Sequence, residues 1–315
     1  MMSDEISAFI LGAGLGTRLR PLTDDLPKPL VPVWNRPLIH HAMDHLIADL
    51  GVTRFLVNTH HCSDRYGEWF PEGKYRETKV SFRHEPVLLD TAGGLDNIRD
   101  WIPADQSFAI YNGDILTDLP LEQAWRAHLD SGNLATLILR SSGDELRVGY
   151  DAGTGRIVDL RGALRPEWEE RYQFTGIYFV SPEFLPFLKV GEIESIVFPL
   201  LRAIEAGAAV GGIVVDEGIW SDLGERDSYL DALSSLRSGV RQGGGKRIDE
   251  SARIAPSAEV DEVSSIGAEA VIGADCRLQE CVIWPGGVVK DGVHLERVVV
   301  RSGQVASRSL SDTDL

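Results

Sequence analysis

Phe9-Ile10-Leu11-Gly12-Ala13-Gly14-Leu15-Gly16-Thr17-Arg18-Leu19 is the stretch that decides the fold, and Pro27-Lys28-Pro29-Leu30 follows it closely. Residues 6–11 form a short apolar run, which is typical of a buried strand, and three alternating glycines end it. A glycine-rich turn after a strand lets backbone N–H groups approach a phosphate, because no Cβ stands in the way. Arg18 and Lys28 supply the positive charge that a triphosphate needs. The stretch therefore predicts a nucleotide-binding loop.

The composition excludes several other classes of protein. A chain of 315 residues with 43% hydrophobic and 25% charged residues is typical of a globular protein with one large and one smaller domain. Its formal net charge of −17 argues against a nucleic-acid partner or an anionic membrane surface. The acidic start does not resemble a signal peptide, no apolar run is long enough to span a bilayer, and three cysteines are too few for a disulfide framework. We therefore expect a cytoplasmic protein.

The chain divides into two regions with different patterns of apolar residues. Up to residue 237, short apolar strands alternate with amphipathic stretches, which predicts an α/β domain: a Rossmann-like mixed, mostly parallel sheet with flanking helices. The first helix is expected to begin near Pro37 and to end at Gly51. A glycine-rich linker is expected at residues 238–249.

Beyond the linker, aliphatic residues recur every six positions. Neither a helix nor plain strand alternation has this period, whereas a triangular parallel β-helix does, because each flat side contributes one inward aliphatic residue. We expect this coil at residues 250–303 and a tail at 304–315. The residues that show the period, with one position lost after the fifth, are Ile254, Val260, Ile266, Ile272, Leu278, Ile283, Val289 and Leu295.

Two common glycine-loop motifs do not fit the opening stretch. A Rossmann dinucleotide fingerprint needs a third glycine at position 17, where this chain has Thr17, and an acidic residue where it has Asn58. A Walker A loop needs Gly-Lys-Ser/Thr, which the stretch lacks.

The stretch resembles, residue by residue, the signature of the sugar-phosphate nucleotidylyltransferases, also called NDP-sugar pyrophosphorylases. The resemblance covers about residues 6–236, and many members carry a left-handed β-helix behind the catalytic domain, which the period of six matches. The other landmarks occur in the family's order: Thr91-Ala92-Gly93-Gly94, Asn112-Gly113-Asp114, Phe174-Thr175-Gly176-Ile177-Tyr178 and Trp220-Ser221-Asp222-Leu223-Gly224.

The resemblance implies one displacement, in which a sugar 1-phosphate attacks the α-phosphorus of a nucleoside triphosphate and pyrophosphate leaves. Such a reaction depends on positioning and on charge neutralisation. Arg18 would hold the leaving pyrophosphate, and Lys28 would bridge the attacking and α phosphates. Asp114 and Asp222 would hold Mg²⁺ on the phosphate oxygens, since that ion prefers oxygen ligands.

The resemblance also implies a nucleotide site. Glu85 is the candidate residue for contacting the nucleobase. Its carboxylate only accepts hydrogen bonds, which favours guanine mildly over uracil. Glu85 is equally well interpreted as a solvated charge at the end of a strand. The base therefore stays open between GTP and UTP or dTTP. The residues expected to bind the nucleotide are Leu11, Gly12, Ala13, Gly14, Gly16, Thr17, Glu85, Asp90, Thr91 and Gly93.

The sugar site departs from the family's pattern. Many members have a Glu-Lys-Pro run before the strand that contains Gly176, and its lysine meets the sugar phosphate; residues 158–166 here contain no lysine. Arg161 is the candidate replacement, with Arg165 as its alternative, and Asn112 and Gly176 are expected to contact the sugar. In lacking this lysine, the chain is similar to the uridylyltransferases of muramic acid recycling. In having the coil, it is similar to mannose-1-phosphate guanylyltransferases.

We therefore expect a nucleotidylyltransferase, with mannose 1-phosphate or a related hexose or heptose 1-phosphate and GTP as the first choice of substrates. A uridylyltransferase acting on an N-acetylmuramate- or glucose-type 1-phosphate is the alternative. A non-catalytic regulatory homologue that binds NDP-sugar would be free to lose Arg18, Lys28, Asp114 and Asp222, which are all present. An acyl-transferring coil has only His294 as a base. A homo-oligomer formed through the coil is also expected.

Overall fold

The computed structural model describes residues 6–237 and 245–315, so most of the expected linker lies outside the described residues. Contacts divide the chain into two compact units. The sheet unit comprises the described residues up to Gly14 together with Met43–Trp220, and the coil unit comprises Leu15–Ala42 and Ser221–Leu315. This division differs from the boundary expected near residue 237, because the segment with Arg18 and Lys28 groups with the coil. The division also falls inside the glycine loop.

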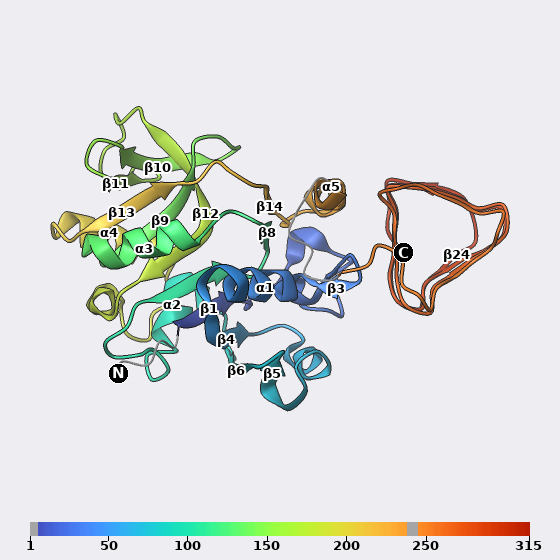
Figure 1. The fold of residues 1–315 in the computed structure, drawn as a ribbon, viewed down its shortest axis with the longest axis horizontal. Coiled ribbons are helices and arrows are strands. Elements are labelled where there is room, and N and C mark those ends of the chain that lie inside the picture. Colours follow the sequence, from blue (N-terminus) through green and yellow to red (C-terminus); the bar gives the residue numbers. More distant parts are fainter. Residues whose placement is uncertain (1–5, 238–244) are drawn as a thin grey trace. The chain divides into compact units, whose positions relative to one another are not determined.

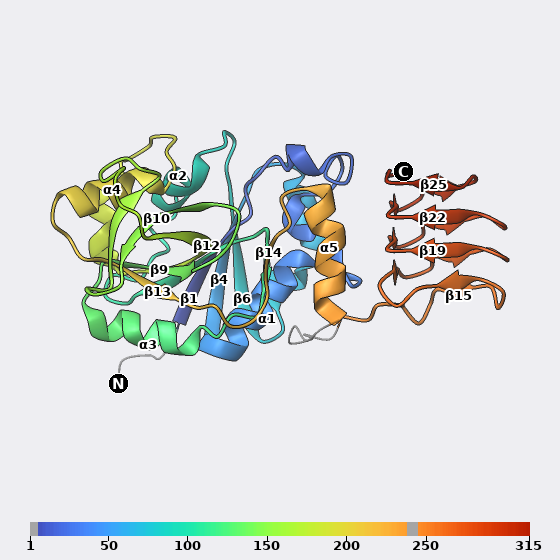
Figure 2. The ribbon, with the colours of Figure 1, turned by 90° about the horizontal axis from the view of Figure 1, so that it is seen from above.

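The sheet unit is built on a ten-stranded sheet (Figures 1 and 2). Strands β6, β4, β1, β7, β9 and β13 run in one direction, and β12 runs against its neighbours β7 and β9. The sheet is therefore mixed, as expected. In spatial order the strands are β10 (Leu146–Asp151), β11 (Arg156–Leu160), β13 (Val210–Val214), β9 (Ala135–Arg140), β12 (Arg171–Val180), β7 (Phe108–Asn112), β1 (Ile6–Leu11), β4 (Val52–Thr59), β6 (Thr78–His84) and β5 (Lys74–Tyr75).

The five α-helices of the described residues are short to medium in length. Helix α1 (Leu38–Leu50) confirms the expectation from the sequence, since Pro37 precedes it and Gly51 ends it with a positive φ of 69°. None of the helices in residues 6–237 and 245–315 has both the length and the apolar character needed to cross a membrane. The others are α2 (Asp90–Asp96), α3 (Glu122–Ser131), α4 (Val197–Glu205) and α5 (Arg226–Arg237).

The register of the central strands collects their carboxyl ends at one edge of the sheet. Leu11 at the end of β1 pairs with Asn112 at the end of β7, and Ile10 pairs with Val57, just before Asn58 in β4. In an open α/β sheet ligands bind outside this edge. The strands are held by an apolar core that includes Phe9, Ile110, Leu137, Tyr178 and Leu200.

The C-terminal residues form a parallel three-sided coil, which Figure 1 shows end-on as a triangle and Figure 2 from the side. Its sides are the sheets β15-β18-β21-β24, β16-β19-β22-β25 and β17-β20-β23. Arg253 pairs with Val271 and Val271 with Val288, so the second step is one residue shorter, which explains the lost position. The expected inward residues line the core, from Ile254 and Val260, which are partly buried, to the fully buried Ile266, Ile272, Leu278, Ile283, Val289 and Leu295.

The short strands of this coil are β15 (Arg253–Ile254), β16 (Glu259–Val260), β17 (Ser265–Ile266), β18 (Val271–Ile272), β19 (Arg277–Gln279), β20 (Val282–Ile283), β21 (Val288–Val289), β22 (His294–Glu296), β23 (Val299–Val300), β24 (Val305–Ala306) and β25 (Leu310–Ser311). The last two lie where a tail was expected. Ala306 is fully buried, and Leu295 pairs with Leu310. The coil therefore continues past Gly303, because Ala306 and Leu310 extend its apolar core.

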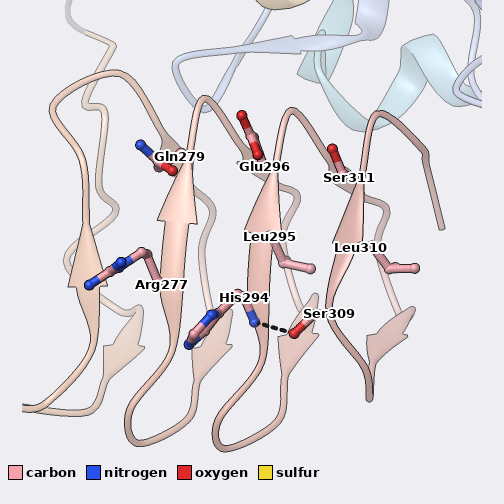
Figure 3. Close-up of a pocket in the computed structure, with 8 residues that line it drawn as sticks. All are labelled: Arg277, Gln279, His294, Leu295, Glu296, Ser309, Leu310 and Ser311. Atoms are coloured by element: carbon pink, nitrogen blue, oxygen red, sulfur yellow. Dashed lines mark hydrogen bonds between the residues drawn. The ribbon is translucent and has the colours of Figure 1, made fainter.

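One outer side of the coil is polar (Figure 3). Arg277 and His294 are neighbours across β19 and β22, Gln279 and Glu296 form a second row, and Leu295 points away from both rows. The backbone N–H of His294 donates to Ser309 Oγ at 3.0 Å. The only histidine of the coil thus lies on an exposed face beside arginine, amide and hydroxyl groups.

Candidate active site

A pocket of about 280 Å³ lies at the carboxyl ends of β1 and β4 in the sheet unit. Four of its lining residues, Leu11, Ala13, Asp90 and Thr91, are ones that the sequence predicts to bind a nucleotide. The pocket is mostly apolar, as the site of a flat base is expected to be. Its complete lining is Leu11, Ala13, Asn58, Leu88, Asp90, Thr91 and Ile193.

Asn58 fixes the backbone at the start of the glycine loop with two hydrogen bonds. Its Oδ1 accepts hydrogen bonds from the N–H groups of Gly12 at 2.7 Å and Ala13 at 3.2 Å. These two N–H groups are thus bound by a buried side chain within the chain, and the part of Gly12 and Ala13 in binding the nucleotide stays a prediction. A Cβ on Gly12 would lie 2.8 Å from the carbonyl oxygen of Asn58, so the close approach needs glycine.

Glu85 belongs to the same buried network and does not line the pocket. Its side chain is fully buried; Oε1 accepts from Asn58 Nδ2 at 2.8 Å, and Oε2 accepts from the Leu89 N–H at 3.1 Å. Burial raises the pKa of Glu85, although these hydrogen bonds and the nearby His60 and His84 act in the opposite direction. The reading of Glu85 as a solvated charge is therefore wrong, while a role beside the base stays a prediction. Its carboxylate fixes the side-chain amide of Asn58.

The start of α2 forms another wall of the pocket. Asp90 has a positive φ of 61°, a conformation that glycine adopts freely, and its Oδ1 accepts from the Thr91 N–H at 2.6 Å. Thr91 Oγ1 accepts from the Ile196 N–H at 2.7 Å, while the N–H groups of Ala92 and Gly93 donate to Glu194 O. The amide of Gly93 is thus bound within the chain.

Asn112 and Gly176, the two residues predicted to contact the sugar, lie close together. Gly176 in β12 has a φ of 79°, and a Cβ there would lie 2.7 Å from Asn112 Nδ2. Asp114 follows two residues after Asn112 and is half-buried. The sequence did not single out Trp220 as a site residue, yet its Nε1 donates to the carbonyl oxygen of Thr175, next to Gly176, at 2.9 Å.

Arg161 is not brought to this subsite by strand pairing. It follows β11, is exposed, and adopts a positive φ of 59°. Among the described strands, β11 pairs with β10 and β13 and not with the strands that contain Asn112 and Gly176. Its loop is instead fixed by Asp159, whose carboxylate accepts from the backbone N–H groups of Gly162, Leu164 and Arg165 and from the Arg171 guanidinium.

In the coil unit, Arg18 lies in a short 3₁₀ turn, Thr17–Leu19, that begins after Gly16. Gly16 has a φ of 58°, and its carbonyl accepts from Thr23 Oγ1 at 2.7 Å, which closes the loop. The Arg18 side chain is 64% exposed and donates to Glu225 Oε1 at 2.8 Å. The guanidinium is thus accessible to a ligand. Gly14, before the unit boundary, has open space where a Cβ would stand.

Lys28 and Asp222 form an ion pair in the same unit, with 3.7 Å between Nζ and Oδ1. The Lys28 side chain is 11% exposed and that of Asp222 is 46% exposed. A Cβ on Gly224 would lie 2.9 Å from Arg18 Nη2 and 3.0 Å from Asp222 Oδ1, so Gly224 leaves room for both groups. Two cations and two carboxylates, those of Asp222 and Glu225, therefore lie near one another, and the cations suit a phosphate site.

The described residues contain no group of three or more His, Cys, Asp or Glu side chains that could hold a metal ion by itself. Mg²⁺ does not require one, because it commonly takes one or two carboxylates and receives its other ligands from substrate phosphates and water. Asp114 belongs to the sheet unit and Asp222 to the coil unit, and each carries the oxygen ligands that Mg²⁺ prefers.

The chain was compared with known proteins. The family described as "Nucleotidyl transferase" matches residues 7–239. A UTP–glucose-1-phosphate uridylyltransferase from Synechocystis sp. is 28% identical over 253 residues, or 74% of this chain; the chain spans only 64% of that relative's length. A probable mannose-1-phosphate guanylyltransferase 3 from Oryza sativa subsp. japonica is 30% identical over 95% of this chain and 82% of its own length.

A solved structure shows the same fold. The crystal structure of a putative glucose-1-phosphate thymidylyltransferase from Bacillus anthracis, in complex with a sucrose, matches with a TM-score of 0.64 at 21% identity and covers 76% of this chain and 98% of that one. The family match spans most of the chain and includes every candidate site residue. The chain belongs to the nucleotidyl transferase family, among the sugar-phosphate nucleotidylyltransferases.

Proposed function

We propose that the protein transfers a nucleotidyl group from a nucleoside triphosphate to a sugar 1-phosphate, giving an NDP-sugar and pyrophosphate. The observation that carries this proposal is the Lys28–Asp222 pair beside an exposed Arg18 in the coil unit. Two polyanions repel each other, so their reaction needs cations that can reach phosphate oxygens. The apolar pocket of the sheet unit supplies a place for the base.

The roles of the charged residues follow from their exposure. Arg18 presents a guanidinium fork that matches the geometry of a leaving pyrophosphate, and 64% of its side chain is open to solvent. Lys28 is mostly buried and is a compact charge; we assign it to the attacking and α phosphates. Asn112 and Gly176 are assigned to the sugar, and the role of Arg161 or Arg165 at the sugar phosphate stays a prediction.

Asp114 and Asp222 are the proposed ligands of a divalent cation, which we take to be Mg²⁺. When bound, the cation neutralises phosphate charge. Asp222 has a second part in this proposal: its ion pair orients Lys28 before substrate enters.

For the substrates we propose GTP and mannose 1-phosphate or a related hexose or heptose 1-phosphate. The support is that a guanylyltransferase-named relative aligns over 95% of this chain, coil included. A uridylyltransferase is the second candidate, favoured by the Synechocystis relative and by the absence of a lysine at residues 158–166. Glu85 adds little to this choice, because both of its carboxylate oxygens already accept hydrogen bonds within the chain.

We propose a Rossmann-like arrangement for the sheet, a left-handed sense for the coil, and self-association through the coil. The polar outer face of the coil carries both charge signs, for example Arg277 and Glu296, as a self-complementary contact requires (Figure 3). The non-catalytic homologue is disfavoured, because Arg18, Lys28, Asp114 and Asp222 are all retained.

The test is direct. Purified protein is incubated with Mg²⁺, each of the common nucleoside triphosphates and a panel of sugar 1-phosphates, and pyrophosphate is measured. We expect release with GTP and mannose 1-phosphate above all other pairs. Release with UTP and a glucose- or muramate-type 1-phosphate instead would establish the second candidate, and no release from folded protein with any pair would overturn the proposal. EDTA should abolish the reaction, and Mg²⁺ should restore it.

A further inference from the structure

We propose that the last turn of the coil, residues 297–315, positions Arg18 for the reaction, with Arg301 as the central positioning residue. The inference rests on the proposed function, in which Arg18 contacts the leaving pyrophosphate. Every contact that carries it lies within the coil unit.

The first contact reaches the loop that contains Arg18. Arg301 Nη1 donates to the carbonyl oxygen of Pro21 at 3.1 Å, three residues after Arg18. Arg301 is itself fixed, because its Nε and its backbone N–H donate to Leu315 O at 2.9 and 3.0 Å. Since the loop is closed by the hydrogen bond from Thr23 to Gly16, a restraint on Pro21 acts on the whole turn.

The second contact reaches the partner of Arg18. Glu225, which accepts from Arg18, is followed directly by Arg226 at the start of α5. Arg226 Nε contacts both carboxylate oxygens of Asp314 at 2.9 and 3.0 Å, and its Nη2 donates to the carbonyl oxygens of Arg297 and Thr313. The Asp314 side chain is only 5% exposed. A buried carboxylate that accepts from a guanidinium, which also donates to two backbone carbonyls, is a firm attachment.

Arg297 strengthens this attachment. Its guanidinium donates to Asp227 and Asp231 of α5 at 3.1 Å each, and to Glu280 of the preceding turn at 2.9 Å. These acids raise the pKa of Arg297, so the group stays charged at every relevant pH. Helix α5, and with it Glu225, is thus fastened at two of its turns to the end of the coil.

These contacts matter because the Arg18–Glu225 ion pair cannot fix Arg18 alone. Both side chains are more than 60% exposed, and such a pair contributes little free energy in water. An open depression of about 600 Å³ surrounds them, lined by Arg18, Glu225, Arg226, Asp227 and Asp312. The position of the guanidinium therefore depends on where Pro21 and Glu225 are held, and the last turn of the coil holds both.

The consequence for the reaction is one of geometry. A displacement of about 1 Å in a group that stabilises the transition state can cost about a hundredfold in rate. Loss of the Arg301–Pro21 contact should therefore lower kcat and weaken the binding of pyrophosphate in the reverse reaction. The KM for the sugar 1-phosphate should change by less than about twofold, because Arg301 acts through Arg18 alone.

The experiment compares Arg301→Met with Arg308→Met in the full chain. Arg308 is an exposed arginine of the same coil, so its substitution controls for loss of one positive charge. We expect kcat to fall about 10- to 100-fold for Arg301→Met and to stay within twofold for Arg308→Met. Arg301→Lys, which keeps one donor for Pro21, should recover part of the loss. Unchanged kcat in folded Arg301→Met would overturn the inference, while an active wild type would leave the proposed function intact.

A double-substitution cycle separates positioning from general destabilisation. In an Arg18→Met background, Arg301→Met should cause no further loss of kcat beyond about twofold; two losses that multiply would overturn the inference. If Arg301→Met does not fold, Asp314→Asn provides the same cycle through Arg226.

Hydrogen exchange gives a readout that needs no activity. Arg301→Met should speed exchange of the Leu19 and Leu22 amides, which donate to Gly16 O and Leu19 O, relative to Arg308→Met. Equal exchange in the two variants would overturn the inference even if the protein proved inactive with every substrate pair.

Discussion

The two units hold their candidate site residues in opposite ways. In the sheet unit, Asn58 and Glu85 are buried and connected by hydrogen bonds at normal distances. In the coil unit, Arg18 is 64% exposed and Asp222 is 46% exposed, and each is joined to its partner by an ion pair. Buried hydrogen bonds are costly to break, whereas exposed ion pairs are nearly free to rearrange.

The difference fits what each part is proposed to bind. A base-sized apolar pocket can be preformed, because its walls are satisfied without a ligand. Arg18 and Asp222, the proposed partners of the pyrophosphate and the cation, are accessible, and so their position has to be set by neighbouring segments. The coil provides that support through the backbone of Pro21 and through α5. In the sheet unit, burial therefore fixes the candidate site residues, whereas in the coil unit contacts from neighbouring segments fix them.

The largest expected effect concerns an exposed residue of the coil unit. Arg18→Ala should lower kcat about 10²- to 10³-fold, the usual cost of removing one stabilising donor at a transition state. The melting temperature should stay within about 2 °C, because an exposed ion pair contributes little stability. Steady-state pyrophosphate release and thermal unfolding measure the two quantities. Arg20→Ala, which removes a neighbouring exposed arginine paired with Asp24, is the control and should keep near-normal kcat.

The next prediction tests whether the coil supports the site. Ile283 is fully buried in the coil, and Ile283→Ala should lower the free energy of unfolding by about 3 kcal/mol. Because residues 15–42 belong to the same unit, heat inactivation should shift down together with unfolding. Circular dichroism and residual activity after heating check this. Activity that survives after the coil has unfolded would contradict the claim that the coil supports the candidate site.

A third prediction addresses the buried network of the sheet unit. Asn58→Ala leaves the Gly12 and Ala13 N–H groups and Glu85 Oε1 without this partner, and should cost about 2 kcal/mol of stability. Asn58→Asp keeps the acceptor but places two carboxyl groups together. Raised carboxyl pKa values favour the folded state only while the groups are protonated, so this variant should lose stability as the pH rises from 4 to 7. Denaturant unfolding at several pH values measures both variants; a wild-type unfolding midpoint in Asn58→Ala would contradict the network.

The smallest effect is a pH dependence confined to the sheet unit. Burial lowers the pKa of His128 to about 4, and its ring contacts the hydroxyl groups of Thr136 and Ser107. A lowered histidine pKa stabilises the folded state above the unfolded pKa of about 6.5 and destabilises it as the pH falls. The free energy of unfolding should drop by about 1 kcal/mol between pH 7 and pH 5.5. His128→Gln should flatten that slope, whereas His294→Gln, on the exposed coil face, should not.

Much of the fold could be predicted from local patterns. The period of six predicted the coil, because each flat side must turn one aliphatic residue inward, and Ile266, Ile272 and Leu278 do so. Alternating apolar runs predicted the mixed sheet, and the glycine loop placed Leu11 and Ala13 at the pocket. The end of the coil was missed, because the alanine at position 306 is too small to stand out as a core residue.

Tertiary structure alone decided which groups share a neighbourhood. Asn58 and Glu85 bond across 27 residues of sequence, and nothing local marks either of them as a partner of the loop. Likewise, Arg301 lies 280 residues from Pro21. The sequence by itself determines the side-chain chemistry and the period of the hydrophobic residues. Which side chains are buried, and which hydrogen-bond partners they have, depends on which distant segments fold against one another. For this reason candidate reacting residues could be proposed from the sequence, whereas the residues that hold them in place could not.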